Sequence, residues 1–296
     1  MTGDPAVLLR LPDGVGLQGP IVDLRGVDVD VSPAAIRDAV RVGCPTRPDR
    51  PTVHAPPPTR VHVHVCHLAP GVSVDRQAAL AAVGAARGVE TAHEADLGRA
   101  KQSLRELSIP TVDDDELRAA RRRAAEAGSE TERLRERVAT LRGRVAARRD
   151  DGDDDALADA EASLSEATRT LSEASTQRVA ATQRLAALED RAQRARDARE
   201  RRLRLEDRVE NLRRARRAAR ADAVGPDFRD ARARIDATVA DRIGATGAEA
   251  DGLRDALAVA VIAPLRAPVV VGADVVTAFG GPEATFERLE APLVIG

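Results

Sequence analysis

Apolar residues recur at alternating steps of three and four along residues 113–222. The first series is Leu117, Ala120, Ala124, Ala127, Thr131, Leu134, Val138, Leu141 and Val145. The second series begins at Leu157, after an aspartate-rich stretch, and continues through Ala160, Leu164, Ala167, Leu171, Ala174, Arg178, Ala181, Leu185, Leu188, Ala192 and Ala195. This spacing is typical of the a and d positions of a coiled coil. The sequence therefore predicts two helices that fold back on each other at Gly152 as an antiparallel coiled-coil hairpin.

Short apolar runs on both sides of this region predict an α/β fold. We expect strands at Val7–Leu11, Ile21–Val31, Arg60–His67, Val269–Val271 and Leu293–Ile295. We expect helices from Ser32-Pro33 and over residues 75–87, 93–107, 227–243, 249–263 and 282–289, with Gly225-Pro226 ending the long helix of the hairpin. All-apolar strands alternating with helices are typical of a parallel sheet that is buried on both faces.

The predicted architecture is an α/β head, with a mixed or parallel sheet built from both chain ends, and the hairpin inserted into it. The expected boundaries are residues 1–112 for the first part of the head, 113–222 for the coiled-coil hairpin and 223–296 for the second part of the head.

Composition indicates the cellular compartment in which we expect the protein. The 46 basic and 48 acidic residues give a net charge of -2, and Lys101 is the only lysine. Cys44 and Cys66 are too few for a disulfide framework, which favours a reducing compartment. We expect a cytoplasmic protein without a membrane segment, because the N-terminus lacks the pattern of a signal peptide and the longest apolar run, residues 256–265, is about half of a bilayer span.

A histidine-rich stretch offers one candidate metal site. On the predicted strand at residues 60–67, His62 and His64 share one face, roughly 6.6 Å apart, and imidazole is a zinc ligand. Cys66 lies too far from His62, at roughly 13 Å, to join the same ion easily. Zinc bound by His62 and His64 is therefore one hypothesis, and a strand face that packs under a helix or meets solvent is the other.

The layout of a head interrupted by a helical hairpin resembles the SMC-like ATPases that hold chromosomes and repair DNA. Their phosphate loop ends in Gly-Lys-Ser/Thr, whereas Lys101 lies in Gly98-Arg99-Ala100-Lys101-Gln102, so the resemblance implies no ATPase activity. The composition and the hairpin also resemble uncharacterised coiled-coil proteins of halophilic archaea, which implies no activity. No Gly-x-Ser-x-Gly motif is present, and an enzymatic role is disfavoured.

Arginine dominates the end of the second predicted helix, where residues 191–220 contain thirteen arginines and five acidic residues. The candidate basic surface consists of Arg191, Arg194, Arg201, Arg204, Arg208, Arg213, Arg216, Arg217 and Arg220. Such a row can follow the phosphates of a nucleic acid, or it can be a solvated helix face with salt bridges to the head.

Three functions follow from these observations. The favoured one is a non-catalytic scaffold or interaction protein that uses the coiled-coil arm to bind itself or another protein. The second is a DNA-associated accessory protein of SMC-like layout without an ATPase, and the third is a metal-dependent enzyme built on His62 and His64.

Overall fold

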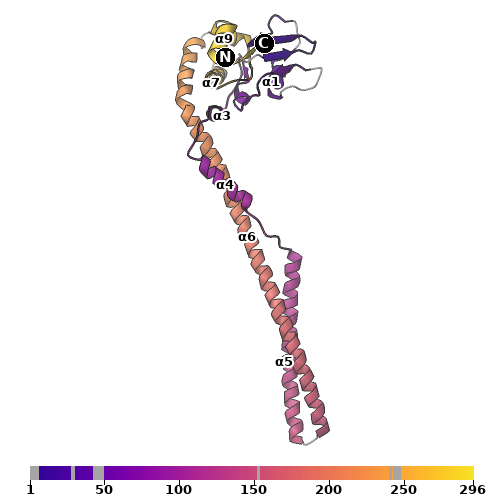
Figure 1. Cartoon of the computed structure of the whole chain (residues 1–296). Coiled ribbons are helices and arrows are strands. Elements are labelled where there is room, and N and C mark those ends of the chain that lie inside the picture. Colours follow the sequence, from indigo (N-terminus) through magenta and orange to yellow (C-terminus); the bar gives the residue numbers. More distant parts are fainter. Residues whose placement is uncertain (1–6, 28–30, 43–49, 152–153, 240–241, 243–247) are drawn as a thin grey trace. The chain divides into compact units, whose positions relative to one another are not determined.

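The structure is a computed structural model that describes residues 7–27, 31–42, 50–151, 154–239, 242 and 248–296 (Figure 1). The chain divides into two compact units. The first, here called the α/β unit, combines Met1–Arg99 with Val209–Gly296, and the second, here called the helical unit, is Ala100–Arg208. The protein is therefore an α/β head, assembled from both parts of the chain, with a long helical insertion.

A four-stranded parallel sheet forms the centre of the α/β unit. Its strands lie in the order β3 (Ile21–Asp23), β7 (Leu293–Ile295), β6 (Val269–Val271) and β5 (His67–Leu68). Val22, Val270 and Val294 belong to the core on one face of this sheet. Val269, Val271, Leu293 and Ile295 belong to the core on the other face. Because both faces are covered, β6 and β7 need apolar side chains at every position.

A second sheet and one helix cover the first face. The order β2 (Gly16–Gly19), β1 (Val7–Arg10), β4 (Thr52–His54) is antiparallel throughout. Helix α1 (Pro33–Val42) packs with this layer through Ile36, which is fully buried together with Leu9. The α1 helix begins as predicted, because the Ser32 hydroxyl accepts a hydrogen bond from the backbone N–H of Ala35 at 3.3 Å.

Helices cover the second face (Figure 1). They are α3 (Arg76–Ala86), α7 (Ala248–Ile262), α8 (Ala273–Phe279), α9 (Pro282–Leu289) and the last part of α6 (Asp154–Val239). No described helix has an apolar stretch that is long enough to span a membrane.

Two glycines allow these helices to pack against neighbouring backbone. A Cβ on Gly84 of α3 would lie 2.7 Å from the carbonyl oxygen of Arg220 in α6, and a Cβ on Gly252 of α7 would come still closer to the carbonyl oxygen of Val72. Both contacts are too close for a side chain, so glycine is required at each position.

The prediction that α6 ends at Gly225-Pro226 is wrong, because the helix is 86 residues long in total and continues to Val239 with Pro226 inside it. Proline normally interrupts a helix, since it has no N–H and its ring meets the preceding turn. Here the following residues are held by packing, because Phe228, Ala231 and Ile235 are all buried in the core of the α/β unit.

An ion-pair network also holds this end of α6. Asp255 of α7 is buried and accepts hydrogen bonds from Arg76 of α3 at 3.0 Å and 2.6 Å. Asp255 also accepts one from Arg232 of α6, which pairs in addition with Asp251 at 2.9 Å. The network therefore joins α3, α6 and α7.

The helical unit contains the second half of α4 (Glu94–Glu106), α5 (Asp114–Asp151) and the first part of α6. Among the described residues, the ion pairs Glu116–Arg184, Arg121–Glu189, Glu132–Arg178 and Arg149–Glu161 join α5 and α6. From Arg121–Glu189 through Glu132–Arg178 to Arg149–Glu161 the residue numbers rise along α5 and fall along α6, so the helices run antiparallel. Val138, Leu141 and Ala167 form a buried cluster between them. The predicted turn at Gly152 lies outside the described residues.

The prediction of a strand at residues 60–67 is wrong. Residues His62–Val65 form the short helix α2, and the strand β5 contains only His67 and Leu68. Val61 and Val65 are both fully buried, whereas Val63 is 62% exposed. The valines four residues apart thus face the core together, which is the spacing of a helix.

Three other differences concern short elements. The predicted strand at Ile21–Val31 ends at Asp23, although residues 28–30 lie outside the described part of the chain. Strand β2 and helix α8 were not predicted, since β2 has a glycine at each end and α8 is only 7 residues long.

Replacing Gly252 by alanine should destabilise the protein by about 1–3 kcal/mol, because the new methyl group must displace the backbone at Val72. The matched control is Gly98→Ala in α4, where no atom lies within 4 Å of the position that the new methyl group would take, and the fold should gain about 0.5–1 kcal/mol. Chemical denaturation of both variants measures the difference. Equal stability of the two variants would contradict the close contact between α7 and Val72.

Candidate functional site

His62 is buried in α2 and uses both ring nitrogens in hydrogen bonds. Its Nδ1 accepts from the backbone N–H of Thr59 at 3.1 Å, and its Nε2 donates to the carbonyl oxygen of Ala267 at 2.9 Å. Because the Thr59 N–H requires an unprotonated Nδ1, the hydrogen of the neutral ring lies on Nε2. Burial lowers the pKa of His62, which favours this neutral form. His62 thus joins α2 to the segment before β6.

These contacts correct the basis of the metal hypothesis. His62 and His64 were expected on one face of a strand, but in α2 they lie two positions apart on a helix, roughly 200° around its axis. Neither ring nitrogen of His62 has a free lone pair for a metal ion. Within the described part of the chain, no three residues of the ligating types are grouped so that they could hold a metal ion.

Two of the nine predicted basic residues pair with another helix of the α/β unit. Arg216 and Arg220 of α6 each pair with Glu94 of α4, at 3.2 Å and 2.9 Å. Arg220 Nε also donates to the carbonyl oxygen of Val89 at 3.2 Å. These arginines are partly buried and fasten α6 to the start of α4, which is the salt-bridge interpretation of the basic segment.

Most of the other predicted arginines pair along α6 itself. The pairs are Arg194–Asp190, Arg204–Glu200, Arg213–Glu210 and Arg217–Glu210. Arg191, Arg201 and Arg208 have no ion pair with any residue that the structure describes. The nine arginines therefore do not form one uniform basic surface.

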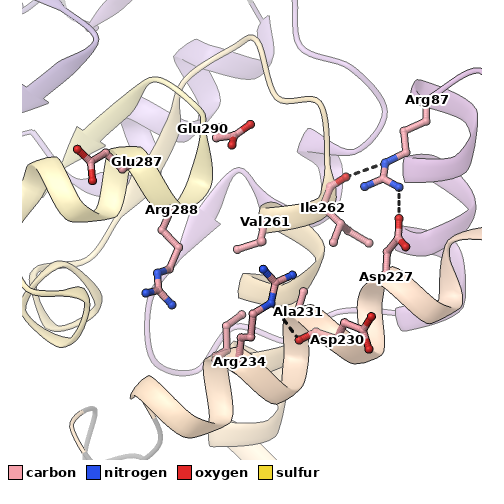
Figure 2. A pocket seen from close by; sticks show the side chains of 11 residues that line it. Arg87, Asp227, Asp230, Ala231, Arg234, Val261, Ile262, Glu287, Arg288 and Glu290 are labelled. Atoms are coloured by element: carbon pink, nitrogen blue, oxygen red, sulfur yellow. Dashed lines mark hydrogen bonds and ion pairs between the residues drawn. The ribbon is translucent and has the colours of Figure 1, made fainter.

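The α/β unit contains a charged cavity of about 490 Å³ that the sequence did not indicate. Its lining comes from the end of α3, from α6 beyond Pro226, from the end of α7 and from α9, and includes Arg87, Asp227, Asp230, Arg234, Ile262, Glu287, Arg288 and Glu290. Figure 2 shows Arg87 between Ile262 and Asp227 at one rim. Arg87 donates to the carbonyl oxygen of Ile262 at 2.9 Å and to the carboxylate of Asp227 at 2.5 Å.

Backbone strain coincides with this cavity at Glu290. This residue follows α9 in the left-handed conformation, with φ 47° and ψ 38°, where glycine is the usual residue. It is the one non-glycine residue with positive φ in the part of the chain that the structure describes. A left-handed non-glycine residue costs roughly 1–2 kcal/mol, which the adjoining buried Leu289 and Ala291 offset.

The chemistry of the cavity suits charged ligands of mixed sign. Three arginines and four carboxylates line it, whereas pockets for small molecules are lined mainly by apolar and aromatic side chains. Sequence reasoning missed this site because its residues come from four separate segments and no motif links them.

A model for a family of unknown function, DUF7856, matches residues 19–293, and the chain therefore belongs to this family. No curated protein and no solved structure matches the chain.

Protonation of His62 should make the α/β unit sensitive to acid. Its pKa in the folded protein lies below the ordinary value of 6.5, so the unfolded chain binds a proton more readily than the folded one. The stability associated with the neutral ring is fully present above about pH 6.5 and is lost as the pH falls toward the lower folded-state pKa. Burial lowers the pKa of His64 and His67 in the same direction.

Urea denaturation between about pH 7.5 and about pH 5 tests this, because each such histidine contributes up to about 1.4 kcal/mol per pH unit. We expect the free energy of unfolding to decrease toward pH 5, and His62→Gln to make that decrease smaller. The control Val53→Ala removes a buried side chain that does not titrate, and should lower stability equally at each pH. An unchanged slope in His62→Gln would contradict the role of this ring.

Proposed function

We propose that this member of the DUF7856 family is a non-catalytic scaffold or interaction protein that binds its partners through the inserted helical arm. The observation that carries the proposal is the arm itself. An insertion of about a hundred residues forms a helical pair with little core of its own beyond the seam between α5 and α6. Its extended outer surface is available to partners.

We interpret the arm as a coiled-coil hairpin. This interpretation is supported by Ala160, Ala167 and Ala174, which are buried at seven-residue spacing along α6. Small residues at such positions allow two helix backbones to approach closely. The interhelical ion pairs Arg121–Glu189 and Arg149–Glu161 flank the seam, as expected for charged positions beside a coiled-coil core.

The alternatives have less support. A metal-dependent enzyme would need His62, whose ring nitrogens are already engaged by Thr59 and Ala267. A DNA-associated role would need the arginines of residues 191–220, most of which have carboxylate partners. The proposal includes a reducing, cytoplasmic setting, which the buried free thiol of Cys66 supports.

Shortening the arm tests the proposal. Replacing residues 131–178 by a short glycine-containing helix–helix loop removes the distal part of both helices and keeps the Glu116–Arg184 and Arg121–Glu189 pairs. In affinity purification followed by mass spectrometry, we expect the full chain to retain specific proteins. The short-arm variant should bind them at least about tenfold more weakly, which corresponds to a loss of about 1.4 kcal/mol of binding free energy. Circular dichroism and thermal unfolding check that the variant folds.

Two outcomes would contradict binding of protein partners through the arm. Retention of the same partners by the short-arm variant would place binding on the α/β unit, and the proposed role of the arm would be wrong. Salt-sensitive binding of duplex DNA by the full chain, lost on Arg201→Glu and Arg208→Glu substitution, would favour the DNA-associated alternative.

A further inference from the structure

One row of residues on the outer side of α6 has an ordered distribution of charge. The row takes every seventh residue and is here called the outer stripe: Asp159, Glu166, Glu173, Ala180, Ala187, Arg194, Arg201 and Arg208. All eight residues are exposed and lie within the helical unit. Three acidic residues are thus followed by two alanines and then by three arginines, over roughly 70 Å of helix.

The buried seam of the arm keeps this row on one side of α6. From Asp159 to Arg194 each stripe residue directly precedes a seam position, and Ala160, Ala167, Ala174, Leu188 and Ala195 are buried at these positions. Since the seam follows a seven-residue spacing from Ala160 to Ala195, the neighbouring row follows the same course along the helix. From Asp159 to Arg194 the stripe therefore faces away from α5, and Arg201 and Arg208 continue the same row as exposed residues.

The charges of the stripe are only weakly engaged within the chain. Glu166 and Arg194 form exposed ion pairs with Arg169 and Asp190 on the same helix, at 2.7 Å and 3.1 Å. Asp159, Arg201 and Arg208 have no ion pair among the residues that the structure describes. Exposed ion pairs within one helix contribute only about 0.3–0.5 kcal/mol to stability, so their charged groups exchange readily for other partners.

The charges of the outer stripe are complementary to those of a second copy that runs in the opposite direction. If a second α6 lies antiparallel on the first, Asp159 faces Arg208, Glu166 faces Arg201 and Glu173 faces Arg194 of the other copy, while Ala180 faces Ala187. Twofold symmetry repeats each of these contacts, as an interface between identical chains requires. A parallel arrangement in register would instead place every charge against its own kind.

We propose that two copies of this chain associate antiparallel through their outer stripes. This inference rests on the proposed function, and it names the partner as a second copy. The two central stripe residues, Ala180 and Ala187, are small, and they adjoin Val179, which is 56% exposed, and Ala186, while the exposed Gln183 lies between them on the helix surface. Close approach of the two helices there removes apolar surface from water, and the charges on either side set direction and register.

The distribution of sign favours a second copy over a nucleic acid as the occupant. A phosphate backbone would gain from Arg194, Arg201 and Arg208, but it would be repelled by the three acidic residues on the same row. The stripe as a whole has no net charge, and only a partner with the inverse order of charges satisfies both halves.

Sedimentation equilibrium of the full chain at about 50 mM and about 500 mM salt tests the association, since screening weakens exposed pairs. We expect a dimer at the lower salt concentration and weaker association at the higher one. Substituting Arg194→Glu, Arg201→Glu and Arg208→Glu together should weaken the dimer by about a hundredfold or more, because six attractive contacts become repulsive. The control carries the same charge change outside the outer stripe, as Arg196→Glu, Arg199→Glu and Arg202→Glu, and should dimerise like the wild type.

Charge reversal on the acidic half provides the restoring experiment. The variant with Asp159→Arg, Glu166→Arg and Glu173→Arg should also be monomeric alone. It should form a heterodimer when mixed with the stripe-arginine variant, which is the one that carries Arg194→Glu, Arg201→Glu and Arg208→Glu. Combining all six substitutions in one chain restores self-complementarity, and that variant should dimerise again. Recovery in the mixture and in the six-fold variant excludes misfolding as the cause of dissociation.

Cross-linking determines the direction of the two chains. In a background with Cys44→Ser and Cys66→Ser, an Ala180→Cys chain mixed with an Ala187→Cys chain should form the mixed disulfide between them. Preferential disulfides between identical chains, or a dimer unaffected by the stripe-arginine substitutions, would overturn the proposal.

The outcomes distinguish this inference from the proposed function. A monomer at every salt concentration would overturn the self-association, whereas loss of partners in the short-arm variant would still support an arm that binds other proteins. Conversely, a dimer with the expected charge dependence supports the stripe even if no further protein is captured. Salt-sensitive DNA binding by a monomeric chain would contradict the stripe and favour the nucleic-acid alternative.

Discussion

The contact between α3 and α6 at Gly84 is the constraint on which the α/β unit depends. The missing side chain of Gly84 allows the backbone of α6 at Arg220 to come within contact distance of α3. The same arginine reaches Glu94 and the carbonyl oxygen of Val89, so the helix is fixed by packing and by charge at one position. A helix that also belongs to the helical unit is thereby anchored in the core of the head.

The near absence of aromatic side chains makes such close contacts necessary. With no tryptophan or tyrosine and three phenylalanines, the core must be filled by alanine, valine, leucine and isoleucine. Small side chains bury enough area only if the layers lie close together. Phe228 and Phe279 are further stacked by guanidinium groups, Arg76 and Arg288, each 5.5 Å from the ring centre. Arginine thus contributes to packing as well as to charge in this chain.

The parts of the fold that the sequence predicts well are those in which one pattern extends over many residues or permits a single structure. The strands β6 and β7 are apolar at each position, and the start of α1 is marked by Ser32 and Pro33. The heptad spacing of α5 and α6 likewise identified the long helices and their facing sides. The pattern around His62 was ambiguous, because the valines at residues 61, 63 and 65 fit a strand by alternation and a helix through the four-residue step from Val61 to Val65.

The candidate sites were predicted less well, because their geometry depends on contacts between distant segments. The engagement of His62 by Ala267 and of Arg216 by Glu94 spans 205 and 122 residues, which local spacing does not encode. The charged cavity collects side chains from four helices in the same way. The outer stripe differs, since its residues follow one period along one helix. The side of α6 on which this row lies follows from the burial of the seam residues.

Pro226 divides α6 into two cooperative segments. It has no N–H to donate to the carbonyl of residue 222, so the succession of backbone hydrogen bonds that transmits helix order is interrupted there. Residues 227–239 are therefore held by their own burial in the α/β core and by the contacts of Arg232. In amide hydrogen exchange, this segment would therefore exchange as part of the α/β core, independently of the helix that precedes the proline.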